Sequence, residues 1–149
     1  MKLCYIDFNA DTDARQVAEA YSSNIDSLAR KYPNTTFVAV TTPLTTVQTG
    51  PKAWAKRLMG RLPGQYAENA KRAEFNALIR DRYGAQGRVF DLARVESEAA
   101  GRRTVVTVDG RQVEALDPTL TYDGGHLNDR GQDVVATAFL SYLSSLPAR

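Results

Sequence analysis

The stretch TFVAVTTPL, residues 36–44, is rich in β-branched and apolar side chains and predicts a strand buried on both faces of a sheet. Two other stretches have the same character, KLCYIDF at 2–8 and RVFDLARV at 88–95. Longer segments with helical character separate the three stretches. Because alternation of strands and helices is typical of parallel sheets, we expect the three strands to lie in one sheet.

Helices are expected between and after these strands. Apolar side chains recur with helical spacing in the first connecting segment, at Val17, Tyr21, Ile25 and Leu28. Asp11 or Thr12 is the expected N-terminal cap of that helix. A second helix is expected over 67–84, and a closing amphipathic helix follows residue 131.

Two further features complete the expected topology. An insertion punctuated by glycine and proline covers residues 45–66. RTVVTVDGRQVEAL, residues 103–116, places Asp109-Gly110 between alternating valine and polar positions, which predicts a hairpin. The chain, residues 1–149, is therefore predicted to be a single α/β domain, a three-layer, flavodoxin-like parallel sheet with helices on both faces.

The composition limits the class of protein. The chain has 149 residues, of which 43% are hydrophobic and 24% charged, as in one globular domain. The net charge of +2 favours no anionic partner, so no nucleic-acid partner is predicted. No apolar run approaches the roughly 20 residues of a membrane span, and the first residues lack a signal-peptide pattern. The compartment is unknown from the sequence, and the chain as it stands is treated as cytoplasmic. Its single cysteine, Cys4, is expected to be a buried free thiol.

The topology predicts where a site would lie. In open α/β sheets, ligands bind beyond the carboxyl ends of the strands. Three loops are expected at this edge: DFNADTD (7–13), TTPLTT (41–46) and VES (95–97). The loop YDGGHLN (122–128) is expected to return to the same edge, because it directly precedes the last helix.

That last loop contains the only histidine of the chain. Asp123 stands three residues before His126, and a tight turn would bring its carboxylate onto the imidazole. Gly124 and Gly125 permit such a turn, and Asn128 can cap the following helix. An imidazole oriented by a carboxylate is the usual general base of acyl transfer. The alternative is a polar loop that caps the helix and exposes the histidine.

A resemblance to a known family favours the catalytic interpretation. The stretch DGGHLNDRG (123–131) before a terminal helix resembles the last conserved block of the SGNH (GDSL-type) serine esterases and acylhydrolases, where Asp-x-x-His supplies two triad members. CYIDFNADTD (4–13) looks like the family's third block, whose asparagine donates to the oxyanion. The strand, helix and strand that follow, within 37–45 and 74–97, are also similar.

The resemblance implies roles for three residues. His126 would be the base, Asp123 its orienting carboxylate and Asn9 a donor to the oxyanion. The third block has Asp7 where the family has a glycine, so a turn or cap role for Asn9 is the alternative.

The family's nucleophilic serine is missing from this sequence. No Gly-x-Ser turn occurs, and the chain resembles the C-terminal two thirds of such an enzyme, shortened at its N-terminus. Ser97, Thr41 and Thr42 are expected near the site edge, but none lies on a strand-to-helix elbow that would expose a nucleophile. They are expected to be structural.

These observations predict a carboxylic ester hydrolase of SGNH type that acts on a small-molecule ester through an Asp-His pair. No metal or organic cofactor is implied, since one histidine and one cysteine make poor metal ligands. The alternative is a binding module that has lost the chemistry, or a fragment that needs another chain for activity.

Two surfaces are expected to bind partners. Trp54, Leu58 and Leu62 recur at intervals of four, and the cations around them are Lys52, Lys56, Arg57 and Arg61. This pattern predicts either a cap or lipid-surface patch, or an ordinary helix packed on its own sheet. If residues 2–8 form an uncovered edge strand, they also predict a homo-oligomer assembled through that edge.

Overall fold

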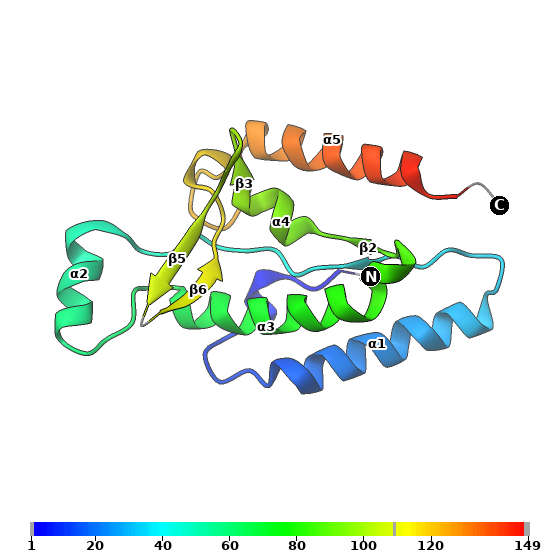
Figure 1. Ribbon diagram of the computed structural model, residues 1–149, viewed down its shortest axis with the longest axis horizontal. Coiled ribbons are helices and arrows are strands. Elements are labelled where there is room, and N and C mark those ends of the chain that lie inside the picture. The colour runs from blue at the N-terminus through cyan, green and yellow to red at the C-terminus, as the bar shows by residue number, and fades with distance from the viewer. Residues whose placement is uncertain (1, 109, 148–149) are drawn as a thin grey trace.

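Helices dominate the computed structural model, which describes residues 2–108 and 110–147, with the side chains of Arg57 and Val108 outside the description. Their bounds are α1 (Ala14–Lys31), α2 (Gly50–Leu58), α3 (Tyr66–Tyr83), α4 (Leu92–Ser97) and α5 (Asp129–Ser145). The helices α1 and α3 pack side by side, α5 runs next to α4, and α2 protrudes at one end (Figure 1). Within the described ranges, no helix is long and apolar enough to cross a membrane.

The strands of the described residues are short and form three separate pairs. β1 (Ala39–Val40) and β2 (Val89–Phe90) are parallel. The antiparallel pairs are β3 (Glu98–Ala99) with β4 (Arg102–Arg103), and β5 (Val105–Val108) with β6 (Arg111–Glu114). The last pair confirms the hairpin predicted over 103–116, although Asp109 of its turn lies outside the described residues.

The predicted three-layer, flavodoxin-like parallel sheet is wrong. In the part of the chain that the structure describes, parallel pairing is limited to two residues on each of β1 and β2. The stretch 2–8 is not a strand: Tyr5–Asp7 forms one turn of 3-10 helix, and Ile6 is 73% exposed. The stretch 88–95 leaves its strand after two residues, because Asp91 caps α4 by accepting the Arg94 N–H.

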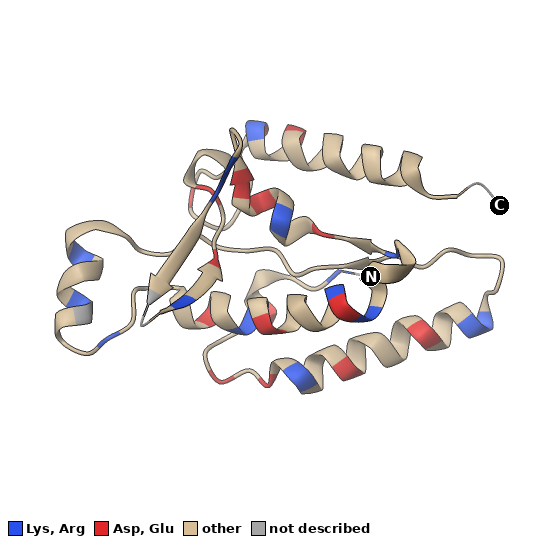
Figure 2. Cartoon of the chain, in the orientation of Figure 1, with Lys and Arg blue, Asp and Glu red and all other residues tan. Residues whose placement is uncertain are grey.

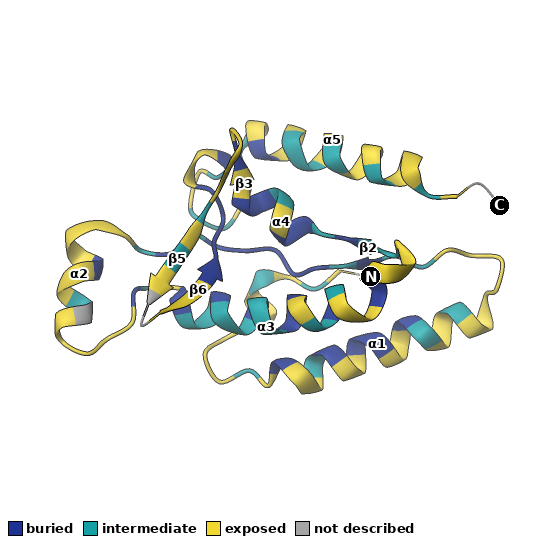
Figure 3. Cartoon of the chain, in the orientation of Figure 1, coloured by how far each residue is buried: buried dark blue, intermediate teal, exposed yellow. Residues whose placement is uncertain are grey.

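The segment after β1 is extended and buried, but side chains take the place of a neighbouring strand. The Asn76 side chain accepts the Thr42 N–H at 2.6 Å and donates to the Thr42 carbonyl at 3.1 Å. Asn69 forms the same pair of bonds with Thr45, at 3.2 and 2.6 Å. Both asparagines are buried residues of α3. Figure 3 shows α3 as a mixture of buried, intermediate and exposed positions. A buried backbone group needs a partner, and here the partner is an amide side chain.

The main apolar core lies between α1 and α3. Phe75 of α3 meets Phe8 and Tyr21 edge-on, with ring centroids 5.3 and 5.5 Å apart. Asp13, rather than Asp11 or Thr12, caps α1 by accepting the N–H groups of the first helical turn. The helices expected from the apolar spacing are therefore confirmed.

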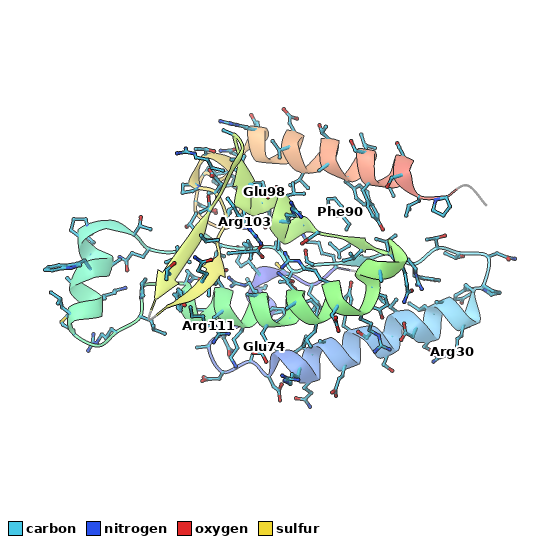
Figure 4. All side chains as sticks on the ribbon, in the orientation of Figure 1. Arg30, Glu74, Phe90, Glu98, Arg103 and Arg111 are labelled. Carbon is cyan, nitrogen blue, oxygen red and sulfur yellow. The ribbon has the colours of Figure 1, made fainter. Side chains whose placement is uncertain are left out.

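The closing helix α5 is also confirmed, and it packs through aromatic side chains. Phe90 of β2, which is labelled in Figure 4, meets two aromatic side chains of α5. Its ring centroid lies 5.0 Å from that of Phe139 and 5.7 Å from that of Tyr142. Charged side chains on α5 lie only near its N-terminal end (Figure 2). That end adjoins the loop that contains His126.

We expect Asn76→Ala to lower the free energy of unfolding by about 2–4 kcal/mol, because it leaves the buried N–H and carbonyl of Thr42 without a partner. Urea denaturation measures the change. The matched control is Asn24→Ala on the exposed face of α1, which should change the same quantity by less than about 0.5 kcal/mol. Equal effects of the two substitutions would contradict the role given to Asn76.

Candidate functional site

The loop that precedes α5 contains the predicted Asp-His pair. Asp123 Oδ2 lies 2.6 Å from His126 Nδ1. Asp123 Oδ1 accepts the backbone N–H groups of Gly125 and His126 at 2.9 and 2.7 Å. The Thr121 hydroxyl closes the loop, since it donates to the His126 carbonyl at 2.6 Å and accepts the Gly124 N–H at 2.9 Å. The predicted geometry of the pair is confirmed.

These contacts bear on the ionisation of Asp123 and on the tautomer of a neutral His126. The hydrogen bond from the His126 N–H, followed by those from its imidazole and from the Gly125 N–H, holds the pKa of Asp123 well below its usual range. An ionised carboxylate only accepts hydrogen bonds, so the imidazole proton is held on Nδ1. A neutral His126 therefore presents its lone pair on Nε2, as a general base must.

Gly124 seats this loop on the extended segment after β1. Its φ is +93°, and an added Cβ would lie 2.7 Å from Thr46 Oγ1. Its carbonyl accepts the Thr46 N–H at 2.8 Å. The close approach requires a glycine, in accordance with the predicted tight turn.

Two tyrosines hold the imidazole. The Tyr5 hydroxyl lies 3.3 Å from His126 Nε2, and the two rings meet edge-on with centroids 5.7 Å apart. On another side, Tyr122 stacks on the imidazole at 6.0 Å with an interplanar angle of 12°. Carboxylate, imidazole and phenol thus form one continuous chain of polar contacts, Asp123–His126–Tyr5.

A cavity of about 360 Å³ opens beside His126. Its polar lining includes Lys2, Cys4, Tyr5, Glu96 and Gln132, and no described serine or threonine lines it. The prediction that four loops meet at the site is therefore confirmed in part. The loops at 41–46, 95–97 and 122–128 come together, whereas Tyr5 stands where a residue of 7–13 was expected.

Glu96 is the buried acid of this cavity. It is 3% exposed, and its Oε2 accepts the Leu44 N–H at 2.7 Å. Burial raises the pKa of Glu96 to about 7, against the lowering effects of the Leu44 hydrogen bond and of Lys2 and Arg72. The carboxyl group therefore changes charge near neutral pH.

Arg72 connects α3 to the site. Its side chain is buried, and its Nε and Nη2 donate to the Tyr5 carbonyl at 3.2 and 2.9 Å. Its Nη1 donates to Thr45 Oγ1 at 2.8 Å and to Asn69 Oδ1. Burial lowers the pKa of Arg72, and the guanidinium holds Tyr5 against the extended segment.

The other predicted site residue, Asn9, lies in the turn before α1. Its Oδ1 accepts the Asp11 N–H at 2.9 Å and the Thr12 hydroxyl at 3.2 Å. No hydrogen bond among the described residues joins Asn9 to Asp123 or His126. Its role as an oxyanion donor stays a prediction.

The prediction made for Cys4 is wrong, whereas the prediction made for two hydroxyl residues near the site agrees with their burial. The buried thiol predicted for Cys4 is wrong, because the side chain is exposed at the cavity. Ser97 and Thr41 are fully buried, as expected of structural residues. The Ser97 hydroxyl donates to the Arg94 carbonyl, and the Thr41 hydroxyl donates to Asp91.

Three residues of the site were not singled out from the sequence: Tyr5, Arg72 and Glu96. Glu96 had a signal, because it lies in the loop VES that was expected at the site edge. Tyr5 and Arg72 had none, since an apolar stretch and a basic helix conceal them. The described residues hold no group of three or more His, Cys, Asp and Glu side chains that could bind a metal ion.

The predicted partner surfaces stay predictions. Trp54 is 65% exposed on α2, with Leu58 and Leu62 also exposed, while the Arg57 side chain lies outside the description. That exposure disfavours a helix packed on its own sheet. Residues 2–8 do not form the expected edge strand, so they offer no hydrogen-bonding edge to a second chain. The homo-oligomer itself stays a prediction.

The comparisons with known proteins give a likeness of fold. No family model matches the sequence, and no curated protein matches it. The chain is similar to a solved structure from Streptococcus pneumonia described as that of a "putative platelet activating factor", with a TM-score of 0.59 and 18% identity. The match covers 93% of this chain and 56% of that one, so this chain spans little more than half of its structural neighbour.

We expect the stability of the protein to respond to the buried carboxyl of Glu96. Its pKa is about 7 in the folded chain against an ordinary 4.5, so the folded state binds more protons between these values. The free energy of unfolding therefore falls as the pH rises through this window, by about 3 kcal/mol from this group. Glu96→Gln removes this titration. The free energy of unfolding of the variant minus that of wild type should therefore rise by about 3 kcal/mol between pH of about 4 and about 8, as measured by urea denaturation at each pH.

Glu98→Gln is the matched control, because Glu98 is exposed and forms only an ion pair with Arg94 one helical turn away. Its effect on the free energy of unfolding should be small, because an exposed ion pair contributes little to stability. A difference between Glu96→Gln and wild type that does not change with pH would contradict the burial argument.

Proposed function

We propose that this chain is a carboxylic ester hydrolase of SGNH type, with His126 as its general base and Asp123 as the carboxylate that orients the base. One observation carries the proposal. Asp123 Oδ2 lies 2.6 Å from His126 Nδ1, while Nε2 is left as the acceptor at the border of a cavity. The resemblance of DGGHLNDRG (123–131) to the family's last block supports it.

The chemistry follows from the charges. During attack on an ester, Nε2 takes a proton and the imidazole becomes cationic. Asp123 is ionised and in contact with Nδ1, so it stabilises this cation. Its Oδ1 is fixed by two backbone N–H groups, which reduces the reorganisation needed when the charge develops.

The cavity suits a small acyl compound. Its volume of about 360 Å³ lies at the lower end of the range for small-molecule sites. Leu127 and the ring of Tyr122 supply apolar lining, and Glu96 and Gln132 supply polar groups. The fold likeness adds no substrate information, so the ester is proposed from the site and from the resemblance of residues 123–131 to the family's last block.

A second candidate is a binding module, or a part of an assembly that is active only with another chain. One observation favours it: among the described residues, no serine lines the cavity that His126 borders. Under this candidate the Asp-His geometry remains, but the isolated chain hydrolyses no ester at a rate that depends on His126.

We expect the chain to hydrolyse p-nitrophenyl acetate, and His126→Ala to lower kcat/KM by about 100-fold or more, because the general base is lost. Asp123→Asn should lower it by a similar order, since an amide does not hold the proton on Nδ1. Release of p-nitrophenolate, followed by absorbance, measures both.

Asp81→Asn on the exposed side of α3 is the control and should keep the wild-type rate. Equal rates for wild type and His126→Ala would sink the proposed activity and favour the binding module. The thermal unfolding midpoint of each variant shows whether a loss of rate comes from unfolding.

A further inference from the structure

We propose that Tyr5 is the nucleophile of this site, and that its phenolic oxygen accepts the acyl group from an activated ester or thioester. The inference rests on the proposed function, because His126 must act as the base. No described serine lines the cavity, but the Tyr5 side chain brings a hydroxyl group to it. Tyrosine is among the side chains that can form covalent acyl intermediates.

The first support is the position of the Tyr5 hydroxyl. It lies 3.3 Å from His126 Nε2, the nitrogen opposite the one that Asp123 contacts. Because Asp123 holds the imidazole proton on Nδ1, Nε2 accepts the proton of the Tyr5 hydroxyl. A nucleophile bonded to a base, which is itself oriented by a third group, is the arrangement that activates a weak nucleophile.

The second support is the space made for the phenol. An added Cβ at Gly125 would lie 3.1 Å from Tyr5 Cζ and 3.2 Å from its hydroxyl oxygen. A side chain at Gly125 would therefore push the phenol away from the loop of the base by a few tenths of an ångström. The hydroxyl end of the Tyr5 ring therefore packs against the backbone of Gly125.

The third support is the charge behind Tyr5. The Arg72 guanidinium is 1% exposed, holds the Tyr5 carbonyl and lies 5.9 Å from the centroid of the Tyr5 ring. Within the described part of the chain, no carboxylate forms an ion pair with Arg72. A buried cation without an ion pair favours negative charge on the neighbouring phenol, as occurs during attack.

The fourth support is access from two sides. Tyr5 and Gly125 line the cavity of about 360 Å³ and also a second one of about 210 Å³. An ester bound over the phenol can therefore place its acyl part on one side and its leaving group on the other. Tyr5 is therefore accessible from both spaces.

The reaction balances without a further reagent besides water. The Tyr5 oxygen forms a bond to the acyl carbon, its proton passes to His126 Nε2, and the bond to the leaving oxygen or sulfur breaks. The leaving group takes the proton from Nε2. Water then gives a proton to Nε2 and attacks the acyl-tyrosine, the carboxylic acid is released, and the proton returns to the phenolic oxygen.

This nucleophile restricts the substrate class. A phenol has a pKa of about 10 and a thiol about 8.5, whereas an aliphatic alcohol is far less acidic. Acyl transfer to a phenol is therefore favourable from aryl esters and thioesters, and unfavourable from alkyl esters. The inferred substrates are acyl groups on an aryl-oxygen or thiol leaving group.

The test uses p-nitrophenyl acetate with the full chain, acid quenching during turnover, and mass spectrometry of the peptides. We expect one acetyl group on Tyr5 in the wild type and none at that position in Tyr5→Phe or His126→Ala. Tyr5→Phe should lower kcat/KM by about 1,000-fold. Tyr32→Phe, an exposed tyrosine away from the cavity, should leave rate and Tyr5 acetylation unchanged.

The outcomes separate this inference from the proposed function. If hydrolysis depends on His126 but Tyr5→Phe stays active, or if the acetyl group is found on Cys4, the inference is overturned and the proposed function stands. If no hydrolysis depends on His126 and Tyr5 is not acetylated, both fail. The acetylation of the wild-type chain is read without any variant, so a Tyr5→Phe chain that misfolds does not remove the test.

Discussion

The extended segment at residues 41–46 joins α3, the Glu96 side chain and the loop of His126 through its backbone hydrogen bonds. It runs through the interior, where each backbone group needs a partner. Asn69 and Asn76 of α3 supply paired amide hydrogen bonds to Thr45 and Thr42, and Glu96 accepts the Leu44 N–H. Side chains of α3 and the Glu96 carboxyl group thus complete the backbone hydrogen bonds that neighbouring strands would otherwise supply. The extended segment can therefore stay buried although the described strands are short.

The same segment positions the site. The Thr46 N–H binds the Gly124 carbonyl, so the loop of Asp123 and His126 rests on this segment. Arg72 binds Thr45 and the Tyr5 carbonyl together, which brings Tyr5 to the other side of the imidazole. The segment 41–46 therefore positions Asp123, His126 and Tyr5 together. A substitution that displaces this segment should displace all three side chains.

The sequence predicted local features better than the sheet. Helical spacing identified α1, α3 and α5, the Asp-Gly turn identified the hairpin, and the spacing of Asp123 and His126 identified the pair, because each depends on neighbours in sequence. The flavodoxin-like sheet was wrong, since β-branched composition does not reveal whether a strand or an asparagine completes the backbone bonds. Tyr5 and Arg72 meet only through a contact across 67 residues, which no local pattern reports.

We propose that Asp123 fixes the imidazole proton on Nδ1 and leaves Nε2 able to accept a proton. His126 is the only histidine, so a long-range ¹H–¹⁵N correlation spectrum of the labelled chain contains one imidazole. At alkaline pH we expect a protonated Nδ1 and an unprotonated Nε2, and a loss of this preference in Asp123→Asn. A neutral imidazole with its proton on Nε2 in the wild-type chain would contradict it.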